Sequence, residues 1–215
     1  MSSVSYQAVQ HLKKVYLYRM THVENIPHIL QHGITHIKSP NRNPAYVPIG
    51  DGSLIANRDN FLMPNNLRPG DYIPFYFGTR MPMLFVIHNG FNNVKRTPSE
   101  QIVYCITSVF EIVLHNLDFV YTNGHGVDEL TDFFEPGTVA GILDHIDKAA
   151  IDRKYWRDDK DLDLKRRKEA EFLVRNDIPV EAILGYAVFN LTAKQNLLNL
   201  GINHDRIVIK PHFYF

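Results

Sequence analysis

The apolar residues of this chain occur in short runs, and this feature limits the fold more than any other. The runs are rich in β-branched and aromatic residues, which is typical of strands. We predict strands over residues 15–20, 71–77, 102–109, 119–121, 171–174 and 206–210. Helical patterns lie between them, at 26–33, 81–87 and 192–200, with the longest at 139–156 and a mixed segment at 180–189. Short strands interrupted by helices and long loops favour an α+β fold, and 215 residues suggest a single domain, 1–215.

The charge balance and the cysteine content exclude several classes of protein. Lys+Arg and Asp+Glu are equal at 23 each, so the chain is not a uniformly basic nucleic-acid coat. The one cysteine, Cys105, excludes a disulfide framework and a cysteine zinc cluster. Without a tight cluster of His, Asp and Glu, we expect no metal. With no signal-like start and no apolar run of about 18 residues, we expect a cytoplasmic protein without a membrane span.

The segment 148–168 is the main departure from this even charge. It holds nine basic and five acidic residues, together with Tyr155 and Trp156. Such a segment can bind a phosphate backbone and stack bases, although a solvated helix end has the same composition. The residues that we predict to contact DNA are Lys154, Trp156, Lys165, Arg166 and Arg167.

Polar residues also stand where local structure does not require them. They are Arg19, Thr21, His22, Asn25, Arg58, Arg80, Glu169 and Glu171. Thr21 has the character of a helix N-cap and His22 that of a surface residue, so both also have an ordinary structural interpretation. Arg58 lies in a segment, 39–70, that reads as a long loop, and loops of this length are more often functional flaps than simple connections.

Glu169 and Glu171 are two residues apart and would share one face of an extended chain. Two carboxylates so close would raise the pKa of one of them. The pair is suited to act on a sugar or a leaving group, but a solvated strand end beside Arg166 and Arg167 explains it equally. We expect Glu171 at an edge, where Glu171→Ala would remove activity and leave the protein folded.

Three segments together resemble the DarT family of DNA ADP-ribosyltransferase toxins. They are YRMTHVENIPHILQHGI at 18–34, GDYIPFYFGTRMPMLFVIHNG at 70–90, and AEFLV with its downstream proline at 170–179. The chain departs from many members at Arg19, Met81 and His125, where they have His, Ser and Asn.

The resemblance implies a compact ADP-ribosyltransferase-like fold with a central mixed or antiparallel sheet and flanking helices. It implies NAD as co-substrate, no metal, and a thymine or guanine base of single-stranded DNA as acceptor. It also implies a cognate antitoxin, a DarG-like ADP-ribosylglycohydrolase. By the same resemblance Glu171 and Arg58 are catalytic, although Arg42 and Arg68 lie in the same segment as Arg58. The residues expected to contact NAD are Arg19, Met20, Thr21, His22, Asn25, Arg58, Tyr76 and Arg80.

Two other functions remain open from the residues. Glu169-Ala-Glu171 has the E-x-E form of transferases that modify arginine on proteins, so the acceptor could be a protein. Alternatively, the aromatic residues Tyr72, Phe75, Tyr76 and Phe77 would suit a non-catalytic module that binds single-stranded nucleic acid.

Overall fold

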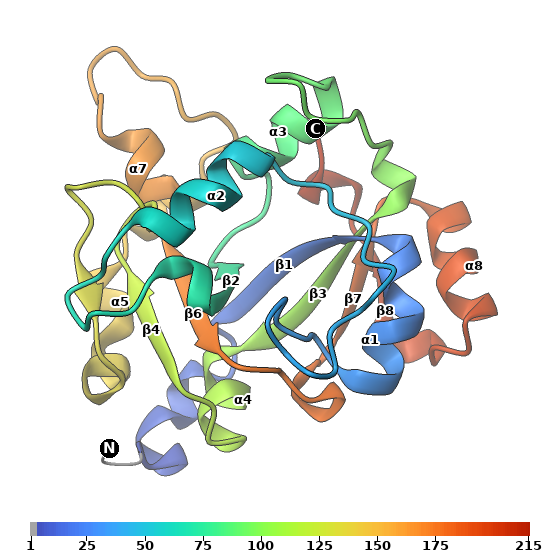
Figure 1. Ribbon diagram of the computed structural model, residues 1–215, viewed down its shortest axis with the longest axis horizontal. Coiled ribbons are helices and arrows are strands. Elements are labelled where there is room, and N and C mark those ends of the chain that lie inside the picture. Colours follow the sequence, from blue (N-terminus) through green and yellow to red (C-terminus); the bar gives the residue numbers. More distant parts are fainter. Residues whose placement is uncertain (1–3) are drawn as a thin grey trace.

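The computed structural model describes residues 4–215, and in this part of the chain eight strands form one sheet (Figure 1). The strand order is β5-β4-β6-β2-β1-β3-β7-β8. The strands are β1 (Tyr16–His22), β2 (Tyr72–Tyr76), β3 (Ile102–Ser108), β4 (Phe119–Thr122), β5 (Phe133–Phe134), β6 (Glu171–Arg175), β7 (Gly185–Val188) and β8 (Ile207–Ile209). Neighbouring strands are antiparallel except β7 and β8, which are parallel. The sheet is mixed, which confirms the predicted α+β class.

The sheet has a weak seam between β1 and β2. These strands are in register at a single pair, Tyr18 with Tyr76, whereas β1 pairs with β3 along its whole length. Next to this pair, the Arg19 guanidinium donates a hydrogen bond to the carbonyl oxygen of Pro74 over 3.0 Å. A side chain therefore replaces the backbone ladder, and the sheet divides into the halves β5-β4-β6-β2 and β1-β3-β7-β8.

Helices cover both faces of this sheet. They are α1 (Ile26–His32), α2 (Gly52–Asn60), α3 (Pro82–Asn89), α4 (Val109–Leu114), α5 (Ile142–His145), α6 (Lys148–Asp152), α7 (Leu164–Lys168) and α8 (Leu191–Asn199). Leu17 and Phe172 of one face pack with α1, α4 and α8, while Met20 and Tyr104 of the other pack with α3 and the C-terminal residues. None of the helices described in residues 4–215 is long and apolar enough to cross a membrane.

The predicted strands are found within a few residues of their expected bounds, but the long helix over 139–156 is wrong. The chain forms the short helices α5 and α6 instead, with Ile146 extended between them. The Asp147 side chain accepts the Ala150 N–H and begins α6, and Arg153 ends it with an extended ψ of 138°. Capping by Asp147 thus interrupts a pattern that is apolar enough for one helix.

Two smaller expectations at the first strand and the long loop are also corrected. Thr21 lies within β1 and is not a cap; the His22 ring accepts the Glu24 N–H and begins the turn before α1. The segment 39–70 is not all loop, because α2 spans nine of its residues behind the cap Asp51. Its sequence, GSLIANRDN, begins with glycine and contains Asn and Asp, which are weak helix formers.

Candidate active site

A buried ion pair lies beside the seam, between Glu171 at the start of β6 and Arg58 of α2. The Arg58 guanidinium donates to both carboxylate oxygens, Nη1 to Oε1 over 3.1 Å and Nη2 to Oε2 over 2.8 Å. The Glu171 side chain is 0% exposed and that of Arg58 13%. The expectation of an edge carboxylate is therefore wrong, because β6 is an inner strand between β4 and β2 (Figure 1) and Arg58 of α2 pairs with its first residue.

The backbone around Glu171 fixes the direction of its carboxylate. The Thr122 hydroxyl accepts the Glu171 N–H over 2.9 Å, and the Gly126 N–H donates to Oε1 over 3.3 Å. A Cβ at Gly126 would lie 3.2 Å from Oε2, so glycine leaves room for the carboxylate there. Neither Thr122 nor Gly126 was predicted from the sequence as a site residue; the local signals for them are the segment YTNGH at 121–125 and the glycines on either side of His125.

The ion pair keeps Glu171 ionised. Burial opposes ionisation and is the largest single influence, but the charge and hydrogen bonds of Arg58 outweigh it, with smaller help from His125 and the Gly126 amide, and the pKa of Glu171 is lowered. For Arg58, burial disfavours the charged form and Glu171 restores it, so its pKa is raised. The carboxylate is thus charged, held in place and shielded from water.

We expect the stability from this pair to disappear in acid. A carboxyl with a lowered pKa stabilises the fold above its unfolded value of about 4.5 and loses that contribution as pH falls through the folded pKa. Breaking a buried pair by removing one partner costs about 3–5 kcal/mol. The free energy of unfolding in urea, measured from pH 3 to 7, should therefore be higher for wild type than for Glu171→Gln, and the difference should be largest at neutral pH. A difference independent of pH would mean that the pair does not hold the charge.

Glu169 differs from Glu171 in both conformation and charge. It is the C-cap of α7 and lies before β6, so the two glutamates do not share one strand as expected. It is buried, with Lys165 Nζ at 3.2 Å from its Oε2. The predicted rise in one pKa is found at Glu169, where burial is the main cause and the Glu171 charge a smaller one.

Residues expected to contact NAD lie on both faces of the seam. Side chains alternate along β1, so Arg19 and Thr21 lie on one face and Met20 and His22 on the other. Arg19, Thr21 and Asn25 line a small cleft with α1 and residues 43 and 46. Tyr76 is in register with Glu171, so the two side chains lie on the same face of the sheet. Tyr18 is in register with Tyr76, and Met20, two residues after Tyr18, therefore lies on this face as well.

Asn25 connects this cleft to the loop that follows α1. Its amide donates to the Val47 carbonyl and accepts the Val47 N–H, both over 2.8 Å, and it also donates to the Thr21 hydroxyl over 3.0 Å. The side chain is 1% exposed. Asn25 therefore holds residues 43–47 over the end of β1 and shapes the cleft.

Tyr76 of β2 lies next to Glu171, and Arg80 follows the end of β2. Burial and the nearby Glu171 charge raise the pKa of Tyr76, so its hydroxyl stays protonated and able to donate. Arg80 follows β2 with a positive φ of 51°, an uncommon conformation for a residue with a side chain. Its charge lowers the pKa of the buried Lys168 and opposes the rise in the pKa of the buried Tyr104.

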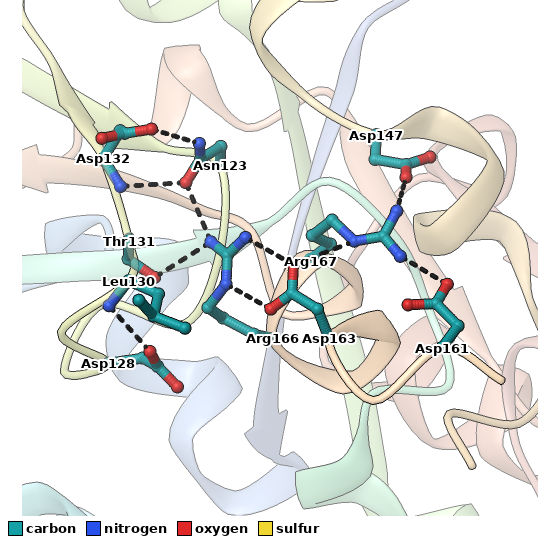
Figure 2. A network of polar contacts seen from close by, with 10 residues as sticks. All are labelled: Asn123, Asp128, Leu130, Thr131, Asp132, Asp147, Asp161, Asp163, Arg166 and Arg167. Atoms are coloured by element: carbon teal, nitrogen blue, oxygen red, sulfur yellow. Dashed lines mark hydrogen bonds and ion pairs between the residues drawn. The ribbon is translucent and has the colours of Figure 1, made fainter. Parts of the chain in front are cut away.

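Most of the predicted DNA-binding residues already have acidic or aromatic partners. Arg166 forms an ion pair with Asp163, and Arg167 forms ion pairs with Asp147, Asp161 and Asp163 (Figure 2). The nitrogen–oxygen distance is 2.7 Å for Arg166–Asp163 and 2.5 Å for Arg167–Asp161.

Lys165 pairs with Glu169, and Trp156 packs edge-on against Phe85 and Phe215. Lys154 is exposed, with its ammonium over the Tyr155 ring. The interspersed acids of the segment therefore neutralise much of its charge. Within residues 4–215, no group of three or more His, Cys, Asp or Glu side chains could hold a metal ion.

Comparisons with known proteins identify the family of this chain. The family model described as "ssDNA thymidine ADP-ribosyltransferase, DarT" matches residues 18–215. The chain belongs to the DarT family. A DNA ADP-ribosyl transferase of Escherichia coli O127:H6 is 30% identical over 188 residues, which cover 86% of this chain and 85% of that protein.

Solved structures extend the DarT relationship to the fold. DarT of Thermus sp. 2.9 in complex with ADP-ribosylated ssDNA has a TM-score of 0.80 at 27% identity and covers 94% of this chain and 96% of that one. The same protein in complex with NAD+ has a TM-score of 0.76 at 28% identity, covering 94% and 98%. A DNA ADP-ribosyl transferase-DNA ADP-ribosyl glycohydrolase fusion protein of Thermosipho africanus is 26% identical over 202 residues, covering 93% of this chain and 49% of that one.

Membership of the DarT family confirms three predictions. The fold is of the ADP-ribosyltransferase type, the enzyme class is that of NAD-dependent DNA ADP-ribosyltransferases, and NAD is the co-substrate.

Proposed function

We propose that this DarT protein transfers ADP-ribose from NAD to a thymine base of single-stranded DNA. The observation that carries the proposal is the Glu171–Arg58 pair, an ionised carboxylate buried beside the seam of an ADP-ribosyltransferase-like sheet. The description of the matching family names thymidine, and a relative was solved with ADP-ribosylated single-stranded DNA. Guanine as acceptor is distinguished by locating the modified base on an oligonucleotide by mass measurement.

Glu171 is suited to stabilise the positive charge that develops on the NAD ribose. NAD supplies the ADP-ribosyl group: the bond from C1′ to the nicotinamide nitrogen breaks, a bond from C1′ to a base nitrogen forms, and the base releases one proton. A fixed carboxylate in a site without water favours that charge and orients the ribose hydroxyls. Arg58 keeps the Glu171 carboxylate ionised and fixes its orientation. Because the pKa of Arg58 is raised, its guanidinium stays charged and cannot accept a proton.

The remaining seam residues suit a phosphate-containing ligand. We assign Arg19 and Thr21 to NAD, since a guanidinium and a hydroxyl line the small cleft together, and Asn25 supports NAD binding by shaping that cleft. The other predicted NAD contacts stay predictions: Met20 and His22 on the opposite face of β1, Tyr76 on β2 and Arg80 after β2.

The exposed part of segment 153–160 is the better candidate for binding the DNA backbone. Lys154, Arg157 and Lys160 are exposed and, within the described residues, form no ion pair, and Tyr155 is 57% exposed. Lysines and arginines bind phosphates, and an exposed ring can stack on a base. Lys165, Arg166 and Arg167 must exchange their acidic partners to bind phosphate, so their contribution stays a prediction.

We further propose that the protein is the toxin of a toxin–antitoxin pair in the cytoplasm, where its DNA substrate lies. The fusion of a DNA ADP-ribosyl transferase with a DNA ADP-ribosyl glycohydrolase in the Thermosipho africanus relative supports this pairing. The cognate antitoxin would then be a DarG-like ADP-ribosylglycohydrolase that removes the modification.

An acceptor comparison tests this function. We expect modification of a single-stranded oligonucleotide in the presence of NAD and little modification of its duplex, because extruding a base costs a few kcal/mol. Binding should weaken steeply as salt rises, since several phosphates are neutralised together. Equal modification of duplex and single strand at matched salt, or transfer to protein alone, would contradict the proposal.

A further inference from the structure

Lys168, the last residue of α7, is buried without an acidic partner. Its side chain is 0% exposed, and it lies three residues before Glu171. Lysine is almost never fully buried unless it is paired. Among residues 4–215 no carboxylate lies within ion-pair distance of its ammonium. Something other than an ion pair must account for its position.

The ammonium of Lys168 binds the end of α6. Its Nζ donates to the carbonyl oxygen of Ile151 over 2.9 Å and to that of Arg153 over 2.5 Å. The last carbonyls of a helix lack partners within it, and a positive charge is favourable there. Lys168 therefore ties the C-terminal end of α6 to the residues that lead into β6.

A third element meets this contact from the side of β2. A Cβ at Gly78 would lie 2.7 Å from Cγ2 of Ile151 and 3.2 Å from the Ile151 oxygen, so the end of α6 packs directly on the backbone after β2. Arg80, two residues after Gly78, carries a positive charge that lowers the pKa of Lys168. The ammonium thus lies where α6, α7 and the β2–α3 connection meet.

Residues 153–160 continue directly from this contact. They carry the exposed Lys154, Arg157 and Lys160, and Trp156 packs on Phe85 and Phe215. The segment has no regular structure beyond Arg153. Three contacts position it relative to β6: the Lys168 ammonium at its start, the Trp156 ring in its middle, and the ion pair of Arg167 with Asp161 directly after its end.

The cost of burying the Lys168 ammonium exceeds the stabilisation that its charge gains at the end of α6. Burial, followed by the Arg80 charge, lowers its pKa to about 8, and Asp152 and Glu169 offset this only in part. A lowered pKa means that the folded state disfavours the ammonium, so stability rises as pH rises from about 8 toward the unfolded value of 10.5. Residues that oppose stability in this way are expected at functional positions.

We propose that Lys168 is a positioning residue that holds the DNA-binding segment 153–160 in register with Glu171. The phosphates that this segment binds would then present the acceptor base at the catalytic carboxylate. This inference rests on the proposed function, because it takes single-stranded DNA as the acceptor. The effect of Lys168 is on where the DNA lies and not on the chemistry of NAD.

The test is Lys168→Met, with Lys194→Met as the matched control. Lys194 of α8 also donates to a backbone carbonyl, that of Ile207 over 3.0 Å, but at the β8 edge of the sheet. We expect the KM for a single-stranded oligonucleotide to rise about ten- to a hundred-fold in Lys168→Met, because a displaced basic segment loses several of its contacts with the phosphates. The kcat at saturating oligonucleotide, the KM for NAD and the Tm should stay near wild type, and Lys194→Met should match wild type throughout.

Direct binding of the oligonucleotide without NAD separates this inference from the proposed function. Lys168→Met should weaken the Kd of the wild-type chain, yet have little effect in a Lys154→Ala/Arg157→Ala/Lys160→Ala background, where the phosphate contacts are already lost. An unchanged Kd and KM would overturn the inference, as would a lower Tm with a parallel loss of kcat. Wild type that binds the oligonucleotide without modifying it would overturn the proposed function alone.

Discussion

Glu171→Gln should lower the rate of ADP-ribose transfer by about a hundred- to a thousand-fold, the usual loss when one preorganised electrostatic group is removed. Glutamine keeps the shape of the side chain and its contact with the Gly126 N–H but carries no charge to stabilise the reacting ribose. The measurement is the initial rate of transfer to a single-stranded oligonucleotide at saturating NAD.

Glu169→Gln is the matched control for this substitution. Glu169 is buried two residues away, and its raised pKa makes glutamine a close substitute for its neutral form. We expect its rate to stay within a few-fold of wild type. An equal loss in both variants would contradict a single catalytic carboxylate and support the E-x-E interpretation, in which both glutamates act and a protein is the acceptor.

Arg58→Ala should lower transfer at pH 7 by about a hundred-fold or more, mainly through Glu171. Without the guanidinium, burial becomes the dominant influence and raises the pKa of Glu171, so the carboxyl is largely neutral. The residual rate should therefore increase with pH between 6 and 9, whereas the wild-type rate should not follow this titration. The measurement is the pH–rate profile of both proteins.

Arg68→Ala is the control for the arginine substitution, because Arg68 is exposed in the same 39–70 segment. It should retain wild-type transfer. A pH profile of Arg58→Ala that matches wild type at a lower rate would mean that Arg58 contacts substrate without setting the Glu171 charge. Unchanged turnover would assign the role to another arginine.

Removal of Glu171 should also destabilise the protein, contrary to what the sequence suggests. The expectation that Glu171→Ala leaves the protein folded depended on an edge carboxylate that contributes little to the core, but the carboxylate is buried against Arg58. Alanine would leave a buried guanidinium without its partner, at a cost of about 3–5 kcal/mol. Circular dichroism must therefore accompany the activity measurements of each variant.

The strands that form the seam were predictable because their signals are local. VYLYRM and DYIPFYF combine β-branched and aromatic residues, and Gly33 at a φ of 75° ends α1 as a glycine stop should. The pairing of Arg58 with Glu171 was not predictable from spacing, because 113 residues separate them and α2 is a poor helix by composition.

The ion pairs of α7 show a signal that sequence reasoning passed over. Asp163 stands three and four residues before Arg166 and Arg167, the spacing at which side chains meet on a helix. Net charge alone suggested a free basic surface, whereas this spacing indicates an internally neutralised one (Figure 2). The burial of Lys168, by contrast, follows from the packing of α6 and α7 and could not be predicted from the sequence around it.

Mass measurement on a single-stranded oligonucleotide with one thymine tests most directly whether the protein uses Glu171 and Arg58 to transfer ADP-ribose from NAD to a thymine base. After incubation with NAD and the wild-type chain, the oligonucleotide should gain the mass of one ADP-ribose, and fragmentation should place it on the thymine. Glu171→Gln should leave the mass unchanged over the same time, and an oligonucleotide without thymine should not react. Modification at guanine, or an equal mass gain with Glu171→Gln, would contradict the account.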